Sequence, residues 1–146
     1  MARIDDLRAW AKGSYPQEAA TELLIRAFGG RFTGTGYEWM GRRDDGAPWV
    51  DFDAIPDNLG GLSGGERRFL LLAAALGGGT EVNLGSLLSL DRDLLDLVLA
   101  AIAHAAGSHE GVVVTEHPDG RASFDRVGTL YPWPAEPRKF RVIEGG

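Results

Sequence analysis

Three histidines and a glutamate lie close together near the C-terminal end of the chain, and imidazole and carboxylate groups are common metal ligands and acid–base groups. His104, His109, Glu110 and His117 do not follow the HExxH pattern or a comparable metal-ligand spacing. Ser108, next to His109, does not stand in a GxSxG motif that would mark it as a nucleophile. We therefore predict no catalytic residue, metal site or cofactor, and keep an enzyme built from such scattered residues as an alternative.

Residues 62–66 spell LSGGE, the signature of ATP-binding cassette ATPases. In those proteins the signature acts opposite a phosphate-binding loop, GxxxxGK, whose backbone amides hold the phosphates. The chain has only two lysines, Lys12 and Lys139, and neither ends such a loop. We therefore predict no ATPase activity.

The same letters predict the start of a helix. Ser63 and Glu66 stand three residues apart, which is the spacing of a capping box. The apolar run that follows predicts a helix ending at Leu76, before three glycines. A second helix is predicted over residues 92–106, with Asp91 as its cap. Because both helices are rich in Leu and Ala, we expect them to pair as the main part of the core, with the second enclosed between other elements.

LSGGERRFLLLAAAL (residues 62–76) is similar to an SGERR-type helix, and LDRDLLDLVLAAIAHAAG (residues 90–107) is similar to an LD…LVL…HA.G helix. Through these two motifs, residues 49–109 resemble small uncharacterised proteins of actinobacteria. Leu94 stands where such proteins often have Asn. The resemblance implies one paired helical unit, and it implies no activity.

The remaining segments predict a helical hairpin followed by short extended pieces. Residues 2–29 read as two helices joined by a glycine turn. Residues 31–40 alternate aromatic and polar side chains among glycines, which predicts a strand-like segment. Residues 49–52 could pair with residues 37–40 as a hairpin, or they could lead into a helical turn at residues 53–55.

These elements predict a mainly α fold. Residues 111–127 predict a β-hairpin around a Pro-Asp-Gly turn. We expect residues 1–130 to form a single-domain helical bundle with one or two small β-hairpins. Residues 131–146 are expected to form an extended C-terminal tail rich in aromatic residues and proline.

The alternative is an α+β, winged-helix-like fold acting as a nucleic-acid-binding regulator. Helices followed by a hairpin across residues 63–127 match that motif, with residues 92–106 as the recognition helix. That helix would carry Asp93 and Asp96 towards the phosphates, and the net charge of the chain is −6. Both features oppose binding to a phosphate backbone, so we do not expect a nucleic-acid partner.

The composition predicts a soluble, cytoplasmic protein without a membrane partner. The chain has 146 residues, 44% of them hydrophobic, and no cysteine, which fits a reducing compartment. Its longest apolar run, residues 69–76, is far shorter than the roughly 20 residues of a membrane helix. The first residues turn acidic where a signal peptide would turn apolar.

Without a reactive constellation, we expect a non-enzymatic protein-interaction or regulatory module. Its partner is predicted to be another protein, and oligomerisation stays open. Aromatic side chains anchor interfaces, so the candidate contacts are Trp39, Trp49, Tyr131 and Trp133, taken to be exposed. The tail that carries the last two could dock on its own domain or bind a partner.

Overall fold

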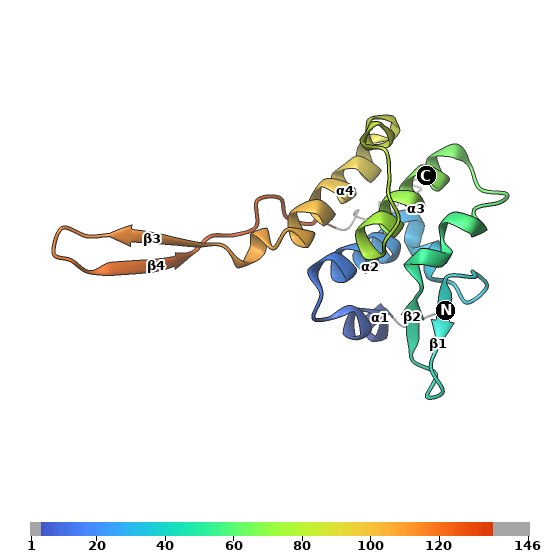
Figure 1. The fold of residues 1–146 in the computed structure, drawn as a ribbon, viewed down its shortest axis with the longest axis horizontal. Helices are drawn as coiled ribbons and strands as arrows, with labels where there is room; N and C mark the ends of the chain where they lie inside the picture. The colour runs from blue at the N-terminus through green and yellow to red at the C-terminus, as the bar shows by residue number, and fades with distance from the viewer. Residues whose placement is uncertain (1–3, 136–146) are drawn as a thin grey trace, which may run out of the picture.

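Residues 4–135 are described in a computed structural model of the chain. The fold is mainly α, with two small antiparallel hairpins, as the sequence predicts (Figure 1). The α-helices are α1 (Ile4–Ala11), α2 (Tyr15–Arg26), α3 (Gly64–Gly77) and α4 (Arg92–Ala105). The strands are β1 (Met40–Arg42) with β2 (Pro48–Val50), and β3 (Val112–Glu116) with β4 (Ala122–Arg126). Short 3₁₀ turns connect them: η1 (Ala27–Thr33), η2 (Phe52–Ala54), η3 (Pro56–Asn58), η4 (Leu84–Ser89) and η5 (Ser108–Glu110).

Helix α2 is the centre of the bundle, because it packs against α1, α3 and α4. Ala19, Ala20, Leu23 and Leu24 are buried, and together they cover more than one side of this helix. Helices α3 and α4 make only a small contact with each other. The expectation that these two helices pair as the main part of the core is therefore wrong, since α2 makes the larger contacts with each of them.

The helix starts follow the caps that the sequence predicts. The Ser63 hydroxyl accepts from the Glu66 amide at 3.2 Å, and the Glu66 carboxylate accepts from the Ser63 amide at 2.9 Å. Asp91 accepts from the Leu94 amide at 2.9 Å at the start of α4. Both predictions are confirmed, so the LSGGE letters form a capping box at the start of α3.

The strand-like segment expected at residues 31–40 is not a strand, except at its last residue. The chain leaves α2 through a left-handed stretch in which Phe28 has φ 53° and two glycines follow. This stretch lies within the 3₁₀ turn η1, and the ring of Phe32 near the end of that turn is buried in the core together with Trp39. Burying these two aromatic rings outweighs the alternating pattern that predicts a strand.

Both structures considered for the next segment occur in succession. Met40 pairs with Val50 and Gly41 with Trp49 in the β1–β2 hairpin, and η2 begins two residues later. The hairpin requires glycine at position 41, because the Trp49 indole lies 2.2–2.5 Å from the place of a Cβ atom there. The indole of Trp49 thus covers the neighbouring strand.

Helix α4 is not enclosed, contrary to expectation. Its buried side chains include Leu94, Val98 and Ala101, spaced as one face of a helix. Leu99 and Ile102, by contrast, are 40% and 42% exposed. Among the described residues, no helix is long and apolar enough to span a bilayer.

Candidate functional site

The expected exposure of Trp39 is wrong, because only 1% of this residue is accessible to solvent. Its indole N–H donates to the carbonyl oxygen of Phe32 at 2.9 Å, and its ring stacks on Tyr37 with centroids 4.7 Å apart. Trp49 is half-buried over Gly41. Both tryptophans therefore have an evident structural role in the N-terminal half of the chain.

The other two predicted contact residues dock on their own domain. The Tyr131 hydroxyl donates to the Asp96 carboxylate in α4, and this hydrogen bond, followed by burial, raises the pKa of Tyr131. The Trp133 ring is half-buried, with the Arg26 guanidinium 5.1 Å from its centroid. The start of the tail thus lies against α2 and α4, and the four predicted residues do not form one site. Residues 136–146 lie outside the described part of the chain.

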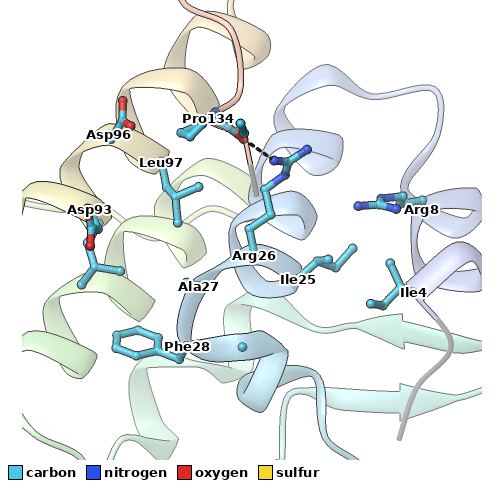
Figure 2. Close-up of a pocket in the computed structure, with 13 residues that line it drawn as sticks. Ile4, Arg8, Ile25, Arg26, Ala27, Phe28, Asp93, Asp96, Leu97 and Pro134 are labelled. Carbon is cyan, nitrogen blue, oxygen red and sulfur yellow. Dashed lines mark hydrogen bonds between the residues drawn. The ribbon is translucent and has the colours of Figure 1, made fainter. Parts of the chain in front are cut away.

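A groove of about 810 Å³ lies between α1, the end of α2, α4 and the docked tail (Figure 2). The tail already uses two of its charged groups, because Arg26 donates to the Pro134 carbonyl at 3.0 Å and Asp96 accepts from Tyr131. The lining residues are Ile4, Arg8, Ile25, Arg26, Ala27, Phe28, Gly29, Asp93, Leu94, Asp96, Leu97, Pro134 and Ala135. The lining is chiefly apolar and includes four charged residues, Arg8, Arg26, Asp93 and Asp96.

An ion-pair network joins the first two helices beside this groove. Glu22 accepts hydrogen bonds from Arg8 and from Arg26, the second at 2.8 Å. Burial raises the pKa of Glu22, but the hydrogen bonds and positive charges of the two arginines outweigh it, so the pKa is lowered overall. The network holds α1 against α2.

The histidines that first suggested chemistry form a packed cluster at the C-terminal end of α4. The rings of His104 and His109 stack with centroids 4.1 Å apart, and the edge of Tyr15 packs on His109 at 4.6 Å. Glu18 lies 3.1 Å from His104 Nε2. Within residues 4–135, no three His, Cys, Asp or Glu side chains meet in a group that could hold a metal ion. The cluster connects the start of α2 to the end of α4.

His117 lies apart from this cluster, in the β3–β4 hairpin, where its Nε2 is 2.9 Å from the Ser123 hydroxyl. We call residues 111–127 the arm. Figure 1 shows that the arm projects from the body of the protein, beyond the C-terminal end of α4. Nearly every residue of its two strands is exposed.

The arm has one apolar face. Val114 pairs with Phe124 across the two strands, and alternation places Val112 and Ala122 on the same side. Phe124 is 70% exposed there. The opposite side carries mainly polar residues: Val113, Thr115, Ser123 and Asp125. The sequence predicts this hairpin, and the alternation of apolar and polar residues in β4 is the signal that could have identified Phe124 as a candidate contact.

The arm is anchored at its base. The Val127 amide donates to the Gly111 carbonyl at 2.9 Å, and the Ser108 and Thr129 hydroxyls are 2.8 Å apart. Close by, the outer face of α4, with Leu99 and Ile102, is also exposed. The strand face of the arm and the outer face of α4 are therefore both uncovered in the described part of the chain, and Leu84 and Leu88 in η4 and Leu130 after the arm are exposed as well.

No protein-family model, curated protein or solved structure matches this chain. The uncovered faces of the arm and of α4 are the candidate functional site.

Proposed function

We propose that this chain is a non-enzymatic protein-interaction module and that the arm, with the outer face of α4, is its contact surface. The observation that carries the proposal is the exposed apolar face of the arm, centred on Phe124 and Val114. A two-stranded hairpin is at best marginally stable in water unless further strands or a helix cover its apolar face. A partner that covers this face would supply the apolar contacts that the isolated hairpin lacks.

The residues around this face support a specific interface rather than non-specific hydrophobic association. Glu116 and Arg126 flank the apolar side chains at the two ends of the same face. Apolar centres bordered by polar groups are typical of protein-binding surfaces. The arm is thus suited to a partner that offers both apolar and charged groups.

The charge of the arm favours a protein over a nucleic acid. Glu116, Asp119 and Asp125 outnumber Arg121 and Arg126, so the arm is not basic. Nucleic-acid surfaces depend on clustered lysine and arginine side chains. We place the module in the cytoplasm, in line with the chain's lack of cysteine.

A photo-crosslinking amino acid at single positions of the arm tests the proposal in cells that express the chain natively. Position 124 lies on the apolar face, whereas position 123 lies on the opposite face and is the matched control. We expect a discrete crosslinked protein species from position 124 and a much weaker one from position 123. Equal crosslinking from both positions, or none from either, would contradict the proposal.

A further inference from the structure

We propose that the partner of this surface is a second copy of the chain, which rests on the interaction function proposed above. In this two-fold dimer, the apolar face of each arm lies along the outer face of α4 of the other copy. The chain carries both halves of the contact, because Phe124 on the arm and Leu99 and Ile102 on α4 are all uncovered. A helix is also one of the elements that stabilise an isolated hairpin.

The direction of the arm allows this exchange. Figure 1 shows the arm continuing past the C-terminal end of α4, away from the body. If a two-fold axis passes near that end, the arm of each copy runs back beside the α4 of the other. The base of the arm then meets the C-terminal end of the partner helix, and its tip meets the N-terminal end.

The spacing of the side chains fits that orientation. Arg92, Leu99 and Ile102 share the outer face of α4, and the ten-residue separation between Arg92 and Ile102 corresponds to about 15 Å along the helix axis. On the apolar face of the arm, Val112 and Glu116 are four residues apart, or about 13 Å. When Val112 lies on Ile102 of the other copy, Glu116 therefore reaches Arg92 of the other copy.

The charges agree with the same orientation. Glu116 and Arg92 are both exposed and have opposite sign, although Asp91 and Asp93, on either side of Arg92, are exposed as well. Arg126 is paired with Val112 at the base of the arm, so it would approach the C-terminal end of the other α4. That end carries the negative pole of the helix dipole and attracts cations. The opposite orientation would bring Glu116 to this negative pole.

The apolar surface is large enough for a weak to moderate dimer. Five side chains contribute per copy, each with on the order of 100 Å² exposed, and the two equivalent contacts together bury roughly 1,000 Å² of them. Polar neighbours bring the total close to the lower bound of specific interfaces, about 1,200 Å². The side chains are Leu99, Ile102, Val112, Val114 and Phe124.

Sedimentation velocity on the full chain over a range of concentrations measures the association. We expect the wild type to dimerise, and Phe124→Thr to weaken the association about tenfold or more, since an aromatic anchor is lost. Leu99→Gln with Ile102→Gln is expected to do the same from the helix side. Val113→Thr is the matched control on the other face of the arm and is expected to dimerise normally. Far-UV circular dichroism checks that each variant is folded.

Mixing the two defective variants distinguishes arm exchange from contact between the two arms. In a heterodimer of Phe124→Thr with Leu99→Gln/Ile102→Gln, one contact has wild-type residues on both sides, and the other has both substitutions. We expect the mixture to associate more strongly than either variant alone. As a second readout, Arg92→Glu and Glu116→Arg should each weaken the dimer, and together they should restore it.

A wild-type chain that stays monomeric at high concentration overturns the dimer. If position 124 nevertheless crosslinks a different protein in cells, the interaction function stands and only the identity of the partner is wrong. A dimer that gains nothing from mixing the two variants, or that the Val113→Thr control disrupts equally, overturns the contact between the arm and α4.

Discussion

Replacing Trp39 by phenylalanine removes the indole N–H that donates to the Phe32 carbonyl at 2.9 Å. Because Trp39 is almost completely buried, water cannot replace the lost donor without opening the core. An unsatisfied buried carbonyl costs about 1–3 kcal/mol. The smaller ring also leaves space in the core, which costs about 1 kcal/mol more. We therefore expect the free energy of unfolding to fall by roughly 2–4 kcal/mol.

Urea unfolding followed by circular dichroism at the helix band measures this loss without depending on tryptophan fluorescence. With a urea dependence of about 2 kcal/mol per molar, the midpoint should fall by roughly 1–2 M. Trp49→Phe is the matched control, since Trp49 is only half-buried and a phenyl ring can still cover Gly41. Its cost should stay below about 1 kcal/mol.

The ordering of these two variants is the critical result. A midpoint for Trp39→Phe that equals the wild-type value, or that lies above the value for Trp49→Phe, would refute the assignment of Trp39 to the core. If Trp39→Phe instead lost partner binding while its free energy of unfolding stayed unchanged, Trp39 would be an interface residue, as first expected.

Three further substitutions test other contacts. Ser63→Ala should lower the free energy of unfolding by about 1 kcal/mol through loss of the capping box, whereas Ser63→Thr should keep most of the stability that the cap provides. Equal urea midpoints for the alanine and threonine variants would count against the cap. Gly41→Ala places a Cβ atom against the Trp49 indole and should lower the free energy of unfolding by about 1–3 kcal/mol in urea unfolding. Replacing Trp49 by leucine in the same protein should restore stability. An unchanged free energy for Gly41→Ala alone would show that the indole can move aside at little cost. The pKa of Glu22 is lowered in the fold, so its contribution to stability is complete above the ordinary value of 4.5 and is lost as the pH falls through the lower folded value. Glu22→Gln should therefore be less stable than the wild type at pH 7, and it should lose less stability when the pH falls below 4.5. Melting temperatures measured at several pH values test this, and the same pH dependence for both proteins would contradict it.

The helix starts could be predicted because their determinants are local. Ser63 and Glu66 bond to each other's backbone within one turn, and Asp91 caps α4 within three residues. Such contacts depend little on what the rest of the chain does. The β3–β4 hairpin is local for the same reason, since a Pro-Asp-Gly turn joins two short alternating strands.

The arrangement of the helices could not be predicted in the same way. Helices α3 and α4 are adjacent in the sequence, yet α2, more than 35 residues before α3, makes the larger contact with each of them. The usable signal was the sequence of α2, where Ala19, Ala20, Leu23 and Leu24 cover more than one side of the helix. A helix with two apolar sides predicts two neighbours, but not which ones.

Residue type alone was also a poor guide to the contact surface. Trp39 and Phe124 are both large aromatic residues, but the first lies in the core and the second on the arm. Trp39 is buried after the chain has passed through the left-handed residues 28–30 and the turn η1, a path that the alternating pattern does not indicate. Phe124 is exposed because nothing in the described residues crosses the arm, which is a property of the whole fold.

During synthesis, α2 leaves the ribosome well before the two helices that it contacts most. Helix α3 can cover one side of α2 once Gly77 has emerged, but the side that meets α4 stays open until Ala105 follows. At about 5–20 residues per second, that interval lasts roughly 1–6 s. The nascent chain therefore exposes an apolar helix side for seconds, and chaperones that bind such segments have their opportunity in this period.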